Sequence, residues 1–233
     1  GATGDPDFKN NKLVHSKNPF AKHDDMTGPY AVYDTLYEAV KQGLTEEDPT
    51  TTDWEGCKAQ INEGNIGCMV LGSWAVPQMQ AGGPNADDIA YMPFPISVDG
   101  KQYASASADY CYGVNVNSTS EEKTAAMLYI KWLTESSGFA KTQGGIPIVK
   151  GDTYPDSLKS FQDITLITDN PAREEDLFNK INNDSEISLD SDSTHVAAIV
   201  EAAIGGGKTM EEIADEWNAE WTSAQEKSGV TPE

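Results

Sequence analysis

The segment 61–74 combines a helix end, an apolar run and a turn without intervening residues. Gly64 can end a helix, and the apolar run 66–71 has the length of a short buried strand. A Gly-Ser pair then predicts a turn that places Trp74 at the carboxyl end of this strand. Because ligands of α/β proteins bind at that edge of the sheet, Trp74 is a candidate ligand contact, with a place in the core as the alternative.

Length, composition and charge limit the possible functions. The chain has 233 residues and 38% apolar side chains, which is enough to build a core. Sixteen basic and 38 acidic side chains give a formal net charge of −22, which repels phosphate backbones, so we expect no nucleic-acid binding. No apolar run reaches the roughly 18 residues that a membrane-spanning helix needs. The start of the chain has no charged and apolar leader, as in a trimmed mature protein or a cytosolic protein without its initiator methionine.

Several segments have apolar residues at helical spacing. They predict a helix from Tyr30 to Gly43, a helix after a capping box of Thr52 and Glu55, a helix over 118–136, a helix over 196–204, and a last helix after a capping box of Thr209 and Glu212. Trp54 lies on the apolar face of the second of these helices and is predicted to be a core residue. A further strand is predicted over 89–95, and an extended segment over 105–116.

Other motifs give no catalytic or metal site. The segment 202–209 resembles a phosphate-binding loop, but Ala202 replaces the first glycine and a helix precedes it. The acidic residues of 190–201 imitate a calcium loop, but His195 stands where glycine is required. We expect no cofactor, no metal and no catalytic residue. The three cysteines form no paired motif and are interpreted as small buried thiols: Cys57, Cys68 and Cys111.

In order and spacing, these segments resemble the carboxyl-terminal part of bacterial extracellular solute-binding proteins, the sugar-capturing components of ABC importers. The matching elements are 48–55, 62–74, 92–95, 109–115, 145–147 and 206–212. The resemblance implies an α/β, periplasmic-binding-protein-like fold of type II, mostly the carboxyl-terminal lobe with part of the other lobe. In such proteins a sugar binds between two lobes that close around a hinge.

The resemblance also implies how the chain is divided. Residues 1–27 form an irregular arm, 28–108 the first part of the carboxyl-terminal lobe, 109–154 a segment of the amino-terminal lobe, and 155–233 the helical part of the carboxyl-terminal lobe. Relatives are nearly twice as long, so the chain resembles a fragment. The apolar face of the helix over 118–136 would then associate with a missing amino-terminal lobe fragment or with a second copy.

The ligand contacts implied by the resemblance are Trp74, Ser73, Asp109, Tyr110 and Asp192. The tryptophan that follows the Gly-Ser turn stacks on a sugar ring in such proteins, and the segment that contains Asp109 and Tyr110 crosses between the lobes. Asp192 stands near the start of a helix that contributes an aromatic contact in relatives; here the position is acidic.

The function implied is non-catalytic capture of a mono- or oligosaccharide for the permease subunits of an ABC importer. Such a protein is extracellular and anchored as a lipoprotein through a missing amino-terminal segment, or it is periplasmic. Two alternatives remain open at this point. In the first alternative the chain is a fragment of a glycoside hydrolase with a carboxylate pair and an aromatic sugar platform. In the second it is an interaction domain whose helical surface binds protein.

Overall fold

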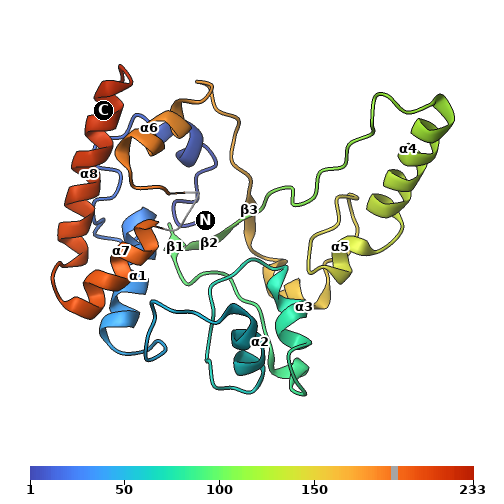
Figure 1. The fold of residues 1–233 in the computed structure, drawn as a ribbon, viewed down its shortest axis with the longest axis horizontal. Helices are drawn as coiled ribbons and strands as arrows, with labels where there is room; N and C mark the ends of the chain where they lie inside the picture. Colours follow the sequence, from blue (N-terminus) through green and yellow to red (C-terminus); the bar gives the residue numbers. More distant parts are fainter. Residues whose placement is uncertain (190–193) are drawn as a thin grey trace. The chain divides into compact units, whose positions relative to one another are not determined.

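The computed structural model describes residues 1–189 and 194–233. Backbone contacts divide the chain into two compact units. Unit 1 comprises Gly1–Thr52, Pro95–Ser107 and Thr165–Glu233, and unit 2 comprises Asp53–Phe94 and Ala108–Ile164. Figure 1 labels the helices and strands along the chain. In the described part of the chain, no helix combines the length and the apolarity that crossing a membrane requires.

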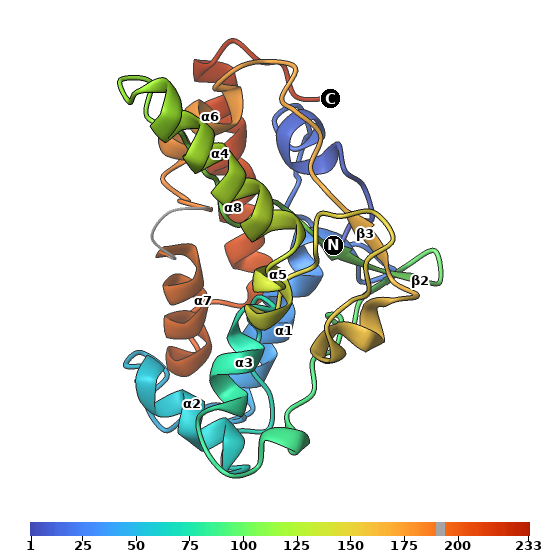
Figure 2. The same cartoon turned by 90° about the vertical axis from the view of Figure 1, so that its right-hand side faces the viewer.

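Unit 1 is built from helices and a small mixed sheet. Its elements are η1 (Phe8–Lys12), α1 (Gly28–Lys41), β1 (Ser97–Val98), β2 (Lys101–Ser105), β3 (Thr165–Ile167), α6 (Leu177–Ser185), α7 (Thr194–Gly205) and α8 (Met210–Lys227). Strand β2 pairs antiparallel with β1 and parallel with β3. Helix α1 packs against α7, and α6 packs against α8 (Figure 2).

The main hydrophobic core belongs to unit 1. Helix α8 contributes Met210, Ile213, Trp217 and Trp221 at helical spacing, and all four side chains are buried. The ring of Phe20 meets each tryptophan edge-on, with 5.7 Å between ring centroids. The prediction that these two tryptophans are packing residues is therefore confirmed.

Residues 1–27 contain η1 and otherwise no regular helix or strand, yet part of this segment lies in the core. Leu13 and Val14 are buried, and their backbone carbonyls accept hydrogen bonds from side chains of α8. The donors are Nε1 of Trp221, at 3.0 Å from the Leu13 oxygen, and Nε2 of Gln225, at 2.9 Å from the Val14 oxygen. These side chains supply partners that a helix or sheet would otherwise give to buried carbonyls.

Unit 2 has a smaller core. Its elements are α2 (Trp54–Asn62), α3 (Ala75–Gln80), η2 (Ala86–Asp88), α4 (Ser120–Glu135), α5 (Phe139–Thr142) and η3 (Asp156–Phe161). Helix α2 packs against α3. No residue of α4 is buried, and its apolar side chains Leu128 and Trp132 are 64% and 53% exposed.

The two capping boxes expected from the sequence have different outcomes. At the start of α8, Thr209 and Glu212 form one: the Glu212 N–H donates to Thr209 Oγ1 at 3.2 Å, and the Thr209 N–H donates to Glu212 Oε2 at 2.8 Å. The predicted capping box of Thr52 and Glu55 does not form, so this prediction is wrong. Helix α2 begins one residue later, because Asp53 caps it by accepting a hydrogen bond from Gly56 N–H, while the Thr52 hydroxyl donates to Glu46.

The predicted strands over 66–71 and 89–95 are also wrong. Both segments are irregular, and no described strand pairs with either. An apolar run becomes a strand only where a neighbour completes its hydrogen bonds, and Val70 is instead 77% exposed. The prediction that the cysteines are small buried thiols is wrong for Cys68 and Cys111, whose side chains are exposed because no described neighbouring strand covers their segments. Cys57 is partly buried.

Candidate functional site

Trp74 stands at the amino-terminal end of α3, immediately after the predicted turn. The turn is present: the Ala75 N–H donates to the Gly72 carbonyl at 3.0 Å, and the Val76 N–H donates to the Ser73 carbonyl at 3.2 Å. The Trp74 side chain is 44% exposed, although the residues that follow it, Ala75 and Val76, are buried. The helix is therefore anchored in unit 2 while the indole reaches solvent.

A second tryptophan supports this indole. The ring of Trp54 lies 5.9 Å from that of Trp74 between centroids, at an interplanar angle of 57°. Lys58 Nζ lies 4.9 Å from the centroid of the Trp54 ring and pairs with Glu55 at 2.9 Å. Trp54, predicted to be a core residue, is only partly buried, because its neighbours are this lysine and a solvent-exposed ring rather than a closed apolar core.

Two glycines permit the close contacts around the turn. A Cβ atom on Gly72 would lie 2.4 Å from Nε1 of Trp74, so the indole rests against a backbone that only glycine keeps free. Gly144 is buried and has a φ of +70°, and its Cβ would lie 2.5 Å from the carbonyl oxygen of Ser73. The loop after α5 therefore packs directly on the turn that carries Trp74.

Asp109 and Tyr110 lie in an exposed, irregular segment of unit 2. The Tyr110 ring is 54% exposed and lies 5.5 Å from the ring of Phe139, the first residue of α5. Helix α5 leads into the loop of Gly144, which touches Ser73. Unit 2 thus contains Trp74, Ser73, Asp109 and Tyr110, and a chain of contacts runs from Tyr110 through α5 to the turn. Asp192 lies outside the described residues.

Asn62 joins α2 and α3, the two helices that carry Trp54 and Trp74 at their amino-terminal ends. It is the last residue of α2 and is 2% exposed. Its Nδ2 donates to the carbonyl of Met79 at 3.0 Å and to that of Gln80 at 3.3 Å, and its Oδ1 accepts from Asn85 N–H at 2.9 Å. One buried amide therefore joins the end of α2 to the end of α3.

Trp54, Phe139 and Gly144 were not among the candidates from the sequence. Trp54 has helical spacing with apolar neighbours, which is the pattern of a core residue. Its contact with Trp74 depends on how α2 packs on α3, and no periodicity reports that. The adjacent glycines at 144 and 145 were a usable signal for a close backbone approach.

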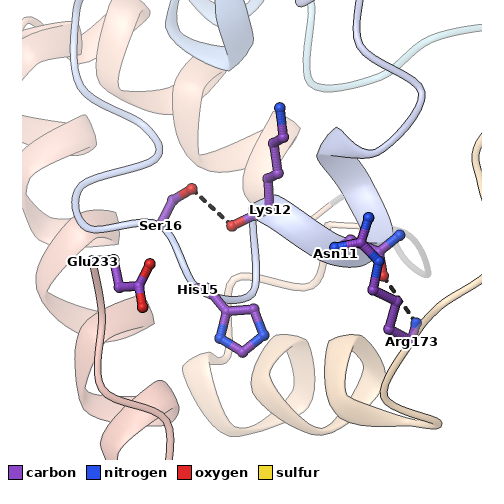
Figure 3. A pocket seen from close by; sticks show the side chains of 6 residues that line it. All are labelled: Asn11, Lys12, His15, Ser16, Arg173 and Glu233. Carbon is purple, nitrogen blue, oxygen red and sulfur yellow. Dashed lines mark hydrogen bonds between the residues drawn. The ribbon is translucent and has the colours of Figure 1, made fainter.

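Unit 1 has a depression of its own, of about 410 Å³, lined by Asn11, Lys12, His15, Ser16, Arg173 and Glu233 (Figure 3). Its basic groups are already paired with carboxylates: Lys12 with Asp5 at 2.6 Å, Arg173 with Asp7 at 3.1 Å, and His15 with Glu174 at 2.7 Å. Among the described residues that line it, each lysine and arginine side chain therefore already has a carboxylate partner.

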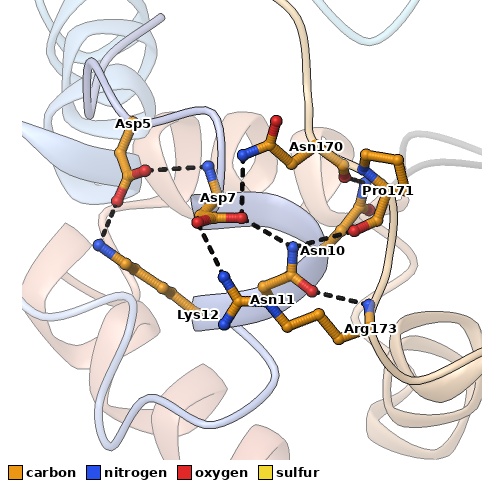
Figure 4. A network of polar contacts seen from close by, with 8 residues as sticks. All are labelled: Asp5, Asp7, Asn10, Asn11, Lys12, Asn170, Pro171 and Arg173. Atoms are coloured by element: carbon orange, nitrogen blue, oxygen red, sulfur yellow. Dashed lines mark hydrogen bonds and ion pairs between the residues drawn. The ribbon is translucent and has the colours of Figure 1, made fainter.

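The network beside this depression is structural (Figure 4). Asp7 Oδ1 accepts hydrogen bonds from Asn170 Nδ2 and Asn11 Nδ2, each at 3.0 Å, and Asn11 Oδ1 accepts from Arg173 N–H at 2.9 Å. The bond from Asn170, followed by those from Asn11 and the charge of Arg173, lowers the pKa of Asp7. The network ties η1 to the segment before α6. Among the described residues no group of three His, Cys, Asp or Glu side chains could hold a metal ion.

Comparison with known proteins identifies relatives. The family model of bacterial extracellular solute-binding proteins matches residues 3–138. A manno-oligosaccharide specific solute-binding protein from Bifidobacterium animalis subsp. lactis, solved with mannotriose, has 51% sequence identity and a TM-score of 0.87. A binding protein of an ABC transporter from the same organism, solved with mannobiose, has 50% identity and a TM-score of 0.87. Each alignment covers 97% of this chain and 54% of the solved one, so the chain spans about half the length of these relatives. A search of curated proteins gave no match.

Proposed function

Because the chain belongs to the bacterial extracellular solute-binding proteins and shares part of their type II α/β fold, we propose that it captures a carbohydrate for an ABC importer without catalysing a reaction. The single observation that carries this proposal is the half-exposed indole of Trp74, held on a fixed turn. A flat aromatic face binds the apolar C–H face of a pyranose, and nearby polar groups then select hydroxyls.

The proposed ligand is a manno-oligosaccharide of two or three units. Support comes from the two solved relatives, which have about half of their aligned residues in common with this chain and were solved with mannobiose and mannotriose. In this proposal Trp74 stacks on one sugar ring, while Ser73, Asp109 and Tyr110 bind hydroxyl groups. Asp192 is kept as a further hydroxyl contact. A glycoside hydrolase is not favoured, because the family and these relatives are binding proteins.

The proposed partners are the permease subunits of the importer and further polypeptide that covers α4. Leu128 and Trp132 of α4 are exposed, and apolar faces of this size on a helix seldom remain bare. We assign the covering polypeptide to the half of the relatives' length that this chain does not span. Residues 109–154 would then belong to the amino-terminal lobe, and 28–108 and 155–233 to the carboxyl-terminal lobe. The proposed location is outside the cytoplasm, as a lipoprotein or in a periplasm.

Isothermal titration of the longest natural form that contains this chain tests the function. We expect saturable heat with mannobiose or mannotriose and no new product by chromatography. Trp74→Ala should weaken binding about tenfold or more, as loss of a central aromatic contact typically does. Met92→Ala, which truncates another exposed apolar side chain of unit 2, should leave the affinity unchanged. Turnover of the sugar, or equal affinities for both variants, would refute the proposal.

The same preparation tests whether further polypeptide packs on the exposed face of α4. If further polypeptide of the protein covers this helix, Trp132→Glu should not change the sedimentation of the chain described. In the longer form the same substitution should lower the stability of the fold. A concentration-dependent dimer of the longer form that Trp132→Glu dissociates would instead identify a second copy as the occupant.

A further inference from the structure

We infer that Trp54 is a positioning residue for Trp74: it fixes the orientation of the indole that the proposed sugar stacks on. The two centroids are 5.9 Å apart and the rings are inclined by 57°. In an inclined contact an edge of one ring meets the other, so Trp54 supports Trp74 without stacking over it. The 44% exposure of Trp74 shows that much of its surface stays open.

The rotation of the Trp74 indole is restricted by a second contact. Its Nε1 and Cδ1 atoms approach Gly72 so closely that a Cβ there would lie 2.4 Å and 2.7 Å from them. The pyrrole edge therefore rests on the backbone of Gly72, while the ring contacts Trp54. Two independent contacts select one staggered rotamer of a side chain that would otherwise populate several.

Trp54 is itself held in place. It is the first residue of α2, whose start is capped by Asp53 at 3.0 Å from Gly56 N–H. Lys58 Nζ lies over the Trp54 ring at 4.9 Å, and the Lys58 side chain is only 17% exposed. An ammonium within about 6 Å of an indole centroid makes a favourable cation–π contact, and this contact keeps the Trp54 ring from turning. Trp74 is thus supported by the inclined ring of Trp54, which Lys58 contacts in turn.

The consequence for binding is pre-organisation. If only one Trp74 rotamer accepts the ligand, the apparent dissociation constant rises in proportion as that rotamer becomes less populated. Releasing the indole into three staggered rotamers should weaken binding about threefold, and more if the open rotamer becomes a minor one. The ligand side of this inference rests on the proposed function, whereas the orientation of the ring does not.

The test compares Trp54→Ala with Trp54→Phe, which keeps an aromatic support. The first readout is the indole N–H resonance of Trp74 in ¹⁵N-labelled protein, assigned by its loss in Trp74→Phe. We expect one sharp resonance in the wild type and in Trp54→Phe, and a broadened or shifted resonance in Trp54→Ala. The second readout is affinity for mannotriose, which should fall about threefold or more in Trp54→Ala and by less than twofold in Trp54→Phe.

The two readouts separate this inference from the proposed function. If no form of the protein binds a sugar, the function fails, while the resonance still decides whether Trp54 orients Trp74. If Trp54→Ala leaves both resonance and affinity unchanged, or if Trp54→Phe is as damaging as Trp54→Ala, the inference is overturned. Should Trp54→Ala disturb α2 as judged by amide exchange, Trp54→Leu keeps a larger apolar side chain than alanine without an aromatic ring and takes its place in the comparison.

Discussion

The indole N–H of Trp221 donates a 3.0 Å hydrogen bond to the carbonyl oxygen of Leu13, although 208 positions separate the two residues. Both are buried in the core of unit 1, and the Trp221 side chain is 0% exposed. A segment without regular structure is thereby made part of the core by a helix near the other end of the chain. The irregular arm and α8 should gain and lose their order together.

Trp221→Phe should destabilise unit 1 by about 2–3 kcal/mol, because it leaves the buried Leu13 carbonyl without its partner and removes part of a fully packed ring. Urea unfolding followed by circular dichroism measures the change. Trp132→Phe in this chain alone is the matched control: Trp132 is 53% exposed on α4, so the same substitution should cost less than about 0.5 kcal/mol. Equal losses in the two variants would contradict a special role for the bond.

Asn62→Ala should destabilise unit 2 by about 2–3 kcal/mol. It removes a 2% exposed amide, leaves the partly buried Asn85 N–H without its acceptor and takes away one of the donors to the Met79 carbonyl. Hydrogen exchange of the α2 and α3 amides measures the effect within this unit. Asn65→Ala, at an exposed position just after the same helix, should leave these exchange rates unchanged. Unchanged protection in Asn62→Ala would mean that α2 and α3 are joined by other contacts.

The sequence was sufficient for those features that are encoded by neighbouring residues. The capping box of Thr209 and Glu212, the helical ends at Gly43 and Gly64, and the two core tryptophans of α8 all follow from local spacing, and the structure confirms them. The binding-protein family and its α/β fold followed from the order of such segments, and the matches to solved relatives confirm both.

Features that depend on a distant partner were not predicted correctly. The apolar run 66–71 has the composition of a strand, but pairing is a property of two segments, and here no described strand lies beside it. The exposure of Trp54 and Trp74 is decided by how α2 meets α3, which the local pattern around each residue does not report. Leu13 has no periodic neighbours, and its burial depends on a core that includes Trp221, far away in the sequence. The ligand contacts stay predictions of the resemblance.

Gly144→Ala should perturb the turn that carries Trp74. Gly144 has a φ of +70°, which costs a residue with a side chain about 1–2 kcal/mol, and its Cβ would also lie 2.5 Å from the Ser73 carbonyl. Gly138→Ala is a close control, because Gly138 has a φ of +74° and open space around its Cβ. We expect the Gly144 variant to be less stable than the control by at least about 1 kcal/mol and to shift Trp fluorescence. Equal stabilities would show that the loop yields without moving the turn.

Alkaline pH should weaken unit 1 through Tyr33. Burial raises the pKa of Tyr33 to about 12 from an ordinary value of 10.0, and its ring lies 5.3 Å from that of Trp217. Because the folded-state pKa is above the unfolded one, the stabilisation is fully present below pH 10 and is lost as the pH rises towards 12. Because protonation and folding are linked, the free energy of unfolding should fall by about 2 kcal/mol by pH 12. Urea unfolding between pH 9 and 12 should show this fall in the wild type and a shallower one in Tyr33→Phe; the same slope in both would exclude Tyr33 as its source.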